Sequence, residues 1–434
     1  MPILFSDVTV VPMDGAPQVL EHAYVAVEGT KIASVGTEPP EGTFDRVVDG
    51  AGKVLLPGFV NAHTHLPMTL MRGYGGGCDL HTWLNQYIFP AEARLDSRAV
   101  AAGAGLGLAE MIASGVTCVA DMYMHTGTIA EQILEAGISA NLSCGGVYFG
   151  APEDFSPETC GDCRNQAALT EEWHGAGAGQ ILVDASVHGE YTSNPPLWRW
   201  MAEYAAEHRL GMHVHVSETQ SEHQASLERW GKTPIQALDG CGVWDCGRSL
   251  AAHCVYTTEE DWALMAEKGI SCVHNPWSNL KLGSGVAPIP AMMRAGVNVA
   301  LGTDGVASNN SHDLFEEIKL AAILHKGIGL DPTAVTARQA LEMATVNGAR
   351  ALGRDTGVIA PGKTADLILV DLSAPNLIPC HDPVEDLVFS AHGSNVEMNM
   401  ARGQVIYEKG SFLTLDLERV RWEVEHYALP LIFG

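Results

Sequence analysis

The sequence predicts an α/β protein, a closed (β/α)₈ TIM-type barrel with a small β-sandwich domain formed by both chain ends. Two observations support this prediction. Eight apolar, β-branched runs alternate with helical patterns in the middle of the chain, and short alternating segments with Gly-bounded turns occupy both ends. The 434 residues suffice for a large barrel with an accessory domain. We expect the composite sandwich domain at residues 1–56 and 356–434, and the barrel at residues 57–355.

The barrel prediction depends on eight strand-like runs, each bounded by turn or helical residues. They are residues 54–65, 117–123, 139–147, 181–190, 211–218, 249–255, 271–276 and 298–305. Helical patterns lie between most of them, for example at residues 97–115 and 197–211. In such a barrel the carboxyl ends of the strands form the active-site face, so residues at these ends are the first candidates for function.

The two ends of the chain have a different residue pattern from the middle. Residues 3–11, 23–36 and 46–58 alternate between apolar and polar side chains, and residues 357–372 and 395–410 return to that pattern. Alternation with Gly-bounded turns is typical of antiparallel hairpins. A short helix is expected at residues 416–428 to close the chain.

Composition and charge exclude several classes of partner. Lys and Arg total 25 against 52 Asp and Glu, which gives a formal net charge of −27. A surface this acidic repels phosphate backbones, so we expect no nucleic-acid polymer as partner. No apolar run reaches the ~18 residues of a membrane span, and the N-terminal residues lack the pattern of an export signal. We therefore expect a cytoplasmic protein without a membrane partner, assembled as a homo-oligomer.

Ten cysteines in a chain without a secretory signal are typical of reduced cytosolic thiols. Cys160 and Cys163 form an isolated CxxC in a segment, residues 150–179, that we expect to cross the barrel mouth as a long loop with one helix. A structural zinc site would need a second cysteine pair, and a redox site would need the CxxC to open a helix. Neither function is expected here.

Four strand ends carry residues able to bind a metal ion. They are His63 and His65 in VNAHTHL, His215 in MHVHVSE, His253 in LAAHCVY and Asp304 in ALGTDG. Histidines and a carboxylate from separate strand ends of a barrel can meet around one Zn²⁺ and leave a position for water. Scattered histidines are the alternative in a chain with 18 of them, but an HxH followed by three matching strand ends favours a metal site.

The neighbouring residues supply acid and base groups. His213 repeats the HxH spacing, but one metal needs only one of the pair, and we assign His215 because Glu218 follows it on the turn out of the strand. His213 is then expected to pack beneath the site. Glu218 is the candidate general acid. His253 could bind the metal or hydrogen-bond the water, and we favour the second role. Asp304 could also accept a proton from that water.

A second metal ion is not expected. Two-metal amide hydrolases commonly bridge their ions with a modified lysine on a middle barrel strand. The chain has no lysine between Lys53 and Lys232. The prediction is therefore a mononuclear site, in which zinc lowers the pKa of its water to ~7 and supplies a nucleophile at neutral pH.

The motifs PGFVNAHTHLPMTLMRG, HVHVSETQSE, HNPWSNLKLGSG and LGTDGVASNN resemble those of the amidohydrolase superfamily. Within it the chain is most similar to the 5'-methylthioadenosine/S-adenosylhomocysteine deaminases, a group related to triazine hydrolases. The resemblance covers nearly the whole chain. It implies a metal-dependent hydrolase that acts on a C–N bond in a cyclic amidine, that is, a deaminase of adenosine-type nucleosides that releases ammonia and the inosine analogue.

The resemblance also implies roles for individual residues. It makes His63, His65, His215 and Asp304 the ligands of one Zn²⁺, which Fe²⁺ or Mn²⁺ could replace. Glu218 would move a proton to purine N1, and His253 would orient the hydroxide. For the substrate, Glu92 would hold the ribose hydroxyls, His188 would contact the purine, and Trp83 would form a wall of the pocket. Taken alone, Glu92 could be a solvated helix residue and Trp83 a core residue.

One departure from the family pattern bears on the substrate. Relatives that accept S-adenosylhomocysteine tend to place an Arg before the fourth strand to bind the amino-acid carboxylate, but residues 141–155 contain no Arg or Lys. Arg164 is the nearest substitute. We therefore expect 5'-methylthioadenosine or adenosine as the small-molecule substrate, with S-adenosylhomocysteine disfavoured. The alternative is the same machinery acting on another aminated or chlorinated heterocycle, such as a triazine, a pterin or another aminopurine base.

Overall fold

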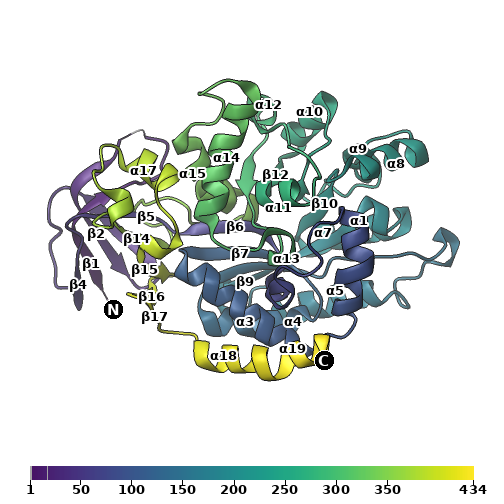
Figure 1. Cartoon of the computed structure of the whole chain (residues 1–434), viewed down its shortest axis with the longest axis horizontal. Helices are drawn as coiled ribbons and strands as arrows, with labels where there is room; N and C mark the ends of the chain where they lie inside the picture. The colour runs from purple at the N-terminus through teal and green to yellow at the C-terminus, as the bar shows by residue number, and fades with distance from the viewer. Residues whose placement is uncertain (1, 17) are drawn as a thin grey trace.

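The computed structural model describes residues 2–16 and 18–434. Its central element is a barrel of eight parallel strands whose order in the sheet follows their order in the chain (Figure 1). The strands are β6 (Phe59–Thr64), β7 (Val116–Met122), β8 (Ser139–Ser143), β9 (Ile181–Gly189), β10 (Gly211–Val216), β11 (Ser249–His253), β12 (Ile270–His274) and β13 (Val299–Leu301). The Asp304 N–H donates to the His63 carbonyl (3.0 Å), which joins the last strand to the first and closes the predicted barrel.

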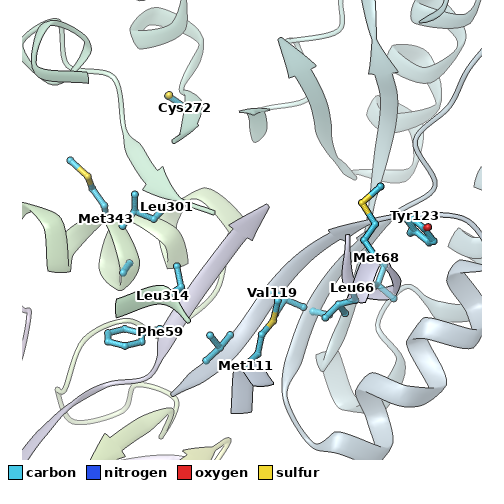
Figure 2. Close-up of a cluster of buried hydrophobic side chains, with 14 of the residues drawn as sticks. Phe59, Leu66, Met68, Met111, Val119, Tyr123, Cys272, Leu301, Leu314 and Met343 are labelled. Carbon is cyan, nitrogen blue, oxygen red and sulfur yellow. The ribbon is translucent and has the colours of Figure 1, made fainter. Parts of the chain in front are cut away.

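Helices surround the barrel and bury the outer face of its strands, while the inner face is filled by the strands' own side chains. The main ones are α3 (Ser97–Ala113), α4 (Thr126–Ala136), α5 (Gly161–Trp173), α7 (Pro195–His208), α8 (Gln220–Trp230), α10 (Glu259–Lys268) and α14 (Leu314–Gly329). Apolar side chains fill the space between them and the strands (Figure 2), where Val119 of β7 lies near Met111 of α3 and the rings of Phe59 and Phe315 meet edge to face at 4.8 Å.

Shorter helical segments connect these elements. They are η1 (Leu66–Met71), α1 (Leu80–Trp83), η2 (Leu84–Ile88), α2 (Phe89–Glu92), η3 (Pro152–Asp154), α6 (Ala176–Gly179), η4 (Glu190–Thr192), α9 (Pro234–Asp239), α11 (Pro276–Lys281), α12 (Ile289–Arg294), α13 (Val306–Asn309), α15 (Ala337–Ala344), α16 (Val346–Leu352), η5 (Pro375–Leu377), α17 (Pro383–Phe389) and η6 (Gly393–Asn395). Those that follow β6 and β9 lie at the carboxyl ends of the strands, where η1, α1, η2, α2 and η4 contribute side chains to the cavity described below.

Both ends of the chain contribute to a second sheet, as predicted. It contains β1 (Ile3–Val10), β2 (Leu20–Glu28), β3 (Lys31–Gly36), β4 (Arg46–Asp49) and β5 (Lys53–Pro57) from the first end, and β14 (Leu367–Asp371), β15 (Val396–Ala401), β16 (Gln404–Glu408) and β17 (Ser411–Phe412) from the other. Strands β5 and β14 pair antiparallel and join the two ends. Phe5, Val25, Leu55 and Leu369 are among the side chains of its own hydrophobic core.

The expected strand at residues 54–65 is wrong in one respect, because the structure divides it into β5 and β6 at Gly58. The Gly58 N–H donates to the Asp366 carbonyl (2.9 Å), and a Cβ at this position would lie 2.3 Å from Cγ2 of Thr117. Only glycine permits this close approach. The break directs β5 into the end sheet and β6 into the barrel, although the apolar run is continuous in sequence.

The chain ends in a helical segment composed of α18 (Leu417–Glu423), η7 (Val424–Ala428) and α19 (Leu429–Phe433). It runs along the outside of the barrel beside α3, not on the end sheet (Figure 1). Arg98 of α3 pairs with Glu423 (2.9 Å) and lies over the Tyr427 ring, and Arg94 donates to the Ile432 carbonyl (2.6 Å). The domain boundaries stay a prediction. None of the described helices is both long and apolar enough to span a bilayer.

Candidate active site

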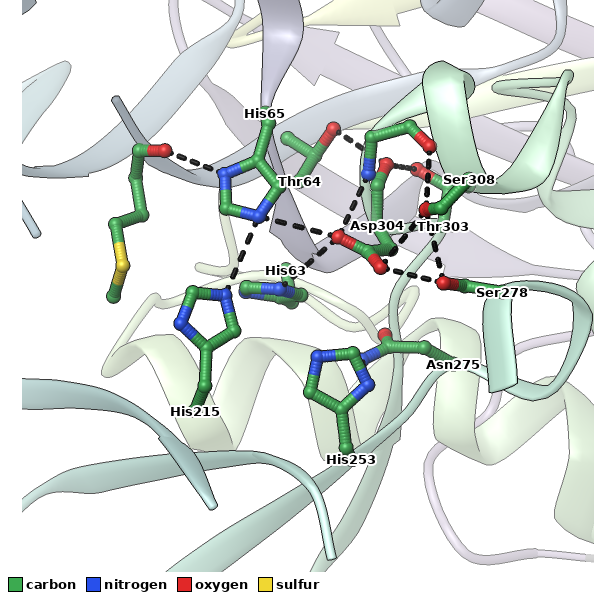
Figure 3. A network of polar contacts seen from close by, with 12 residues as sticks. His63, Thr64, His65, His215, His253, Asn275, Ser278, Thr303, Asp304 and Ser308 are labelled. Carbon is green, nitrogen blue, oxygen red and sulfur yellow. Dashed lines mark hydrogen bonds and ion pairs between the residues drawn. The ribbon is translucent and has the colours of Figure 1, made fainter. Parts of the chain in front are cut away.

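The side chains predicted to bind a metal converge at the carboxyl ends of the barrel strands (Figure 3). His63 lies on β6 and His65 directly follows it, His215 lies on β10, His253 ends β11, and Asp304 follows β13. His253 and Asp304 adopt positive φ angles of 75° and 58°, which non-glycine residues rarely do. Such strained backbone is concentrated at functional sites, because the surrounding structure must hold it in place.

The protonation states of two histidines follow from their carbonyl partners. His65 Nδ1 lies 2.6 Å from the Met122 carbonyl oxygen, and His215 Nδ1 lies 2.6 Å from that of His188. A carbonyl only accepts, so both Nδ1 atoms must carry the hydrogen. In the neutral rings both Nε2 atoms then present lone pairs, and these atoms lie 3.3 Å apart. Two facing lone pairs at this distance favour a cation between them.

Two further potential ligand atoms lie beside the two facing Nε2 atoms. Asp304 Oδ1 lies 3.2 Å from His65 Nε2 and 3.5 Å from His63 Nε2. His63 Nε2 is buried and has no hydrogen-bond partner among the described residues. Because buried polar atoms normally have partners, an unpartnered nitrogen aimed at a carboxylate and two other imidazoles indicates a missing ion. The arrangement is a three-nitrogen, one-oxygen donor set of the kind that zinc prefers.

Burial keeps two of the three histidine rings neutral. Burial lowers the pKa of His63 to about 3 and that of His215 well below its usual value, so both rings keep their lone pairs. Burial also opposes protonation of His65, but the hydrogen bond and the charge of Asp304 outweigh it and raise the pKa to about 9.

Other side chains hold the candidate ligands in place. His213 lies beneath the site, as expected, with its Nε2 2.8 Å from His63 Nδ1. The hydroxyls of Ser278 and Ser308 donate to Asp304 Oδ2 at 2.6 and 3.0 Å (Figure 3). These bonds occupy the second carboxylate oxygen and leave Oδ1 facing the histidines.

Glu218 lies beside this cluster, on the turn after β10. Its side chain is buried, and burial raises its pKa, which favours the protonated form that a general acid needs. The Glu222 carboxylate accepts from the N–H groups of Ser217 and Glu218 at 2.8 Å each and thereby fixes the turn. Glu218 Oε2 lies 3.7 Å from His253 Nε2.

His253 is oriented by an amide behind it. Its Nδ1 lies 2.8 Å from Asn279 Oδ1, so Nδ1 donates and the neutral ring presents a free lone pair at Nε2 toward the site. His63, His215 and His253 also form a group whose potential ligand atoms lie within 4.8 Å of one another, as do those of His63, His65 and Asp304. Both roles considered for His253, metal ligand and water-orienting base, agree with this placement.

A cavity of about 400 Å³ opens above the cluster. All residues of the predicted catalytic, metal-binding and substrate-binding set line it except His63, which lies beneath: His65, Trp83, Glu92, His188, His215, Glu218, His253 and Asp304. Trp83 is buried, and its indole donates to the Tyr74 carbonyl (3.2 Å). Burial lowers the pKa of His188 to about 4, so its ring is neutral. The wall is otherwise largely apolar.

The described residues that line the cavity include Asp162 but no Lys or Arg. Arg164, the cation considered from the sequence, lies outside the lining, and its side chain donates to the Glu158 carbonyl (3.1 Å). The expected loop position of Cys160 and Cys163 is wrong, because Cys160 is the N-cap of α5. Burial and the neighbouring Cys160 raise the pKa of the Cys163 thiol, so it is not activated.

Sequence reasoning missed the residues that support the site. Glu222 had a signal, since Thr219 and Glu222 form a capping box, a pattern readable in sequence. Ser278 and Asn279 carried none, because each polar side chain reaches its partner only when distant strand ends meet in space. Ser308 bonds Asp304 four residues earlier in the chain, within the polar loop that follows this strand end.

A model of the amidohydrolase family matches residues 54–406. The chain belongs to this family. A 5-methylthioadenosine/S-adenosylhomocysteine deaminase of Caldanaerobacter subterraneus subsp. tengcongensis is 42% identical and aligns over 100% of this chain and 99% of its own. A 5'-deoxyadenosine deaminase of Methanosarcina mazei is 40% identical over 99% and 98%. The crystal structure of an adenosine deaminase from Xanthomonas campestris with bound zinc is similar at a TM-score of 0.92, with 33% identity over 99% and 98%.

These findings confirm the family resemblance and the barrel with a second sheet from both ends. They also bear out the prediction of a hydrolytic deaminase with a zinc-type site. The individual roles of the site residues stay predictions. The distances, burial and hydrogen bonds described above are the physical basis on which these roles can be tested.

Proposed function

We propose that this amidohydrolase is a zinc-dependent deaminase of adenosine-type nucleosides, such as 5'-methylthioadenosine and adenosine. The observation that carries the proposal is the convergence of His63, His65, His215 and Asp304 beside the buried acid Glu218, at the base of a largely apolar cavity. The similarity to relatives that are 5-methylthioadenosine/S-adenosylhomocysteine and 5'-deoxyadenosine deaminases supports the proposal. The expectation of a cytoplasmic homo-oligomer belongs to the same proposal.

The donor set fits zinc, because His63 Nε2 lacks a protein partner and the neighbouring lone pairs face one another. His63, His65, His215 and Asp304 would hold the ion. When bound there, zinc would lower the pKa of a water ligand and supply a nucleophile at neutral pH. Ser278 and Ser308 would keep Asp304 in its orientation toward the ion.

Deamination replaces the 6-amino group of the purine with oxygen. The oxygen of water adds to C6, a proton is delivered to N1, and the amino nitrogen leaves as ammonia. Glu218 is placed to deliver the proton, since burial raises the pKa of its carboxyl and the backbone bonds to Glu222 hold its turn rigid. Proton transfer by a positioned carboxylic acid contributes roughly 10²–10⁴-fold to such reactions.

His253 orients the attacking water in this proposal. Its Nδ1–H is held by Asn279, so the lone pair at Nε2 can accept a hydrogen bond from that water. Glu92 would bind the ribose hydroxyls, His188 would contact the purine, and Trp83 would form a wall of the pocket. All three line the same cavity.

The test is ammonia release across a panel of adenosine-type nucleosides, free aminopurine bases, pterins and triazines. The proposal requires kcat/KM to be highest for an adenosine-type nucleoside, with the inosine analogue as product. Turnover confined to triazines or free bases would show that the same machinery serves another heterocycle. Turnover of none would contradict the proposal.

A further inference from the structure

Tyr123 directly follows β7 at the edge of the candidate active site. Its side chain is 6% exposed and lines the cavity, and its ring centroid lies 6.3 Å from that of His65. Figure 2 shows Tyr123 beside Met68, another residue of the cavity wall. The backbone is fixed on both sides, because its N–H donates to the Ser143 carbonyl (3.1 Å) and its carbonyl accepts from the Thr126 hydroxyl (2.8 Å).

The hydroxyl of this rigidly held side chain forms no well-directed hydrogen bond with the described residues, although it lies close enough to the Glu92 carboxylate for each group to shift the pKa of the other. Burying an unpartnered hydroxyl is unfavourable, so native structures rarely leave one without a reason. Because the residue lines a cavity large enough for a nucleoside, the missing partner is expected to come from a ligand.

Glu92 provides the complementary group. Its side chain is 8% exposed and lines the same cavity, and burial raises its pKa while the neighbouring Tyr123 and the charge of His65 lower it in part. Burial and the nearby Glu92 carboxylate keep the pKa of the Tyr123 hydroxyl well above its usual value, so the hydroxyl remains a donor. The two groups are therefore neighbours, one offering a hydrogen and the other accepting hydrogens, although they do not form a hydrogen bond of good geometry with each other.

This pairing matches the two adjacent hydroxyls of a ribose. A carboxylate can accept one hydrogen from each hydroxyl, and a phenol can donate to the oxygen of one of them.

We propose that Tyr123 is a specificity-determining residue that donates a hydrogen bond to a ribose hydroxyl, next to Glu92. The inference rests on the proposed function and adds to it the selection of ribonucleosides over deoxynucleosides. A site that hydrogen-bonds a substrate hydroxyl rejects an analogue without that hydroxyl, because its own buried groups are then left unpaired.

The test compares the unsubstituted enzyme with Tyr123→Phe, which keeps the ring and removes only the hydroxyl. Adenosine, 2'-deoxyadenosine and 3'-deoxyadenosine form the substrate set. We expect Tyr123→Phe to lower kcat/KM for adenosine about tenfold, with little further loss for the deoxy analogue that lacks the bonded hydroxyl. Tyr148→Phe is the matched control, since Tyr148 lies outside the cavity lining and its hydroxyl donates to the Ala151 carbonyl (3.4 Å).

Metal content and thermal unfolding of each variant show whether it is folded. Equal losses on all three substrates, or no loss on adenosine, would overturn the role of Tyr123 while leaving the proposed function intact. If the unsubstituted enzyme neither deaminates these nucleosides nor binds adenosine or inosine in calorimetry, the proposed function and this inference both fail.

Discussion

His65 and His215 face each other across 3.3 Å through nitrogen atoms that carry no hydrogen in the neutral rings. Each ring is fixed in this tautomer by a carbonyl behind it, that of Met122 for His65 and that of His188 for His215. The barrel thus uses backbone carbonyls from neighbouring strands to aim two lone pairs at one point. Such bonds from the far side of an imidazole are typical of metal-binding histidines.

The role of Glu218 can be tested by Glu218→Gln. The variant should fold and retain its metal, because the side chain keeps its shape and is not expected to be a ligand. It should lose roughly 10²–10⁴-fold in kcat, since an amide cannot deliver a proton to the purine ring. Steady-state kinetics combined with metal analysis measure both properties. A variant that keeps more than about a third of the parent kcat, with its metal in place, would exclude Glu218 as the proton donor.

The hydroxyls that hold Asp304 should affect metal affinity. Replacing both serines, Ser278→Ala with Ser308→Ala, frees Asp304 Oδ2 and should weaken metal binding by about 10–100-fold, the usual effect of losing such supporting bonds. Competition with a chromogenic chelator measures the affinity. Ser221→Ala, on the exposed start of α8, serves as the control. An unchanged affinity would show that Asp304 is held by the backbone alone.

The cavity should discriminate against a carboxylate on the substrate. The described lining contains Asp162 and Glu92 but no Lys or Arg, and a charge-assisted hydrogen bond of the kind a carboxylate needs contributes ~1.5–3 kcal/mol. We expect 5'-methylthioadenosine or adenosine to exceed S-adenosylhomocysteine roughly ten- to a hundredfold in kcat/KM.

Competition between two substrates at equal concentration measures this preference directly. Arg164→Ala should leave it unchanged, because Arg164 lies outside the lining and bonds the Glu158 carbonyl. A preference for S-adenosylhomocysteine that disappears in Arg164→Ala would show that the α5 segment moves over the cavity when the substrate binds.

The metal-binding part of the site was predictable because each candidate ligand ends an apolar run, and the ends of parallel strands in a barrel lie on one face. The local backbone geometry was not predictable from the sequence. Gly58 divides a continuous apolar run because a Cβ at this position would collide with Thr117, in the next strand of the barrel. Ser217, His253 and Asp304 adopt positive φ angles. The sequence does not indicate these turns, because none of the three residues is a glycine. Tertiary contacts impose both features.

The most direct test of the account is zinc titration of metal-free protein with adenosine deamination as the readout. The account predicts negligible activity without metal, a linear rise on addition of zinc, and a plateau at one equivalent per chain. The single equivalent follows from one cluster built by His63, His65, His215 and Asp304, and from the absence of lysine between residues 53 and 232 that could bridge a second ion. Full activity in rigorously metal-free protein, or a plateau at two equivalents, would contradict the mononuclear mechanism.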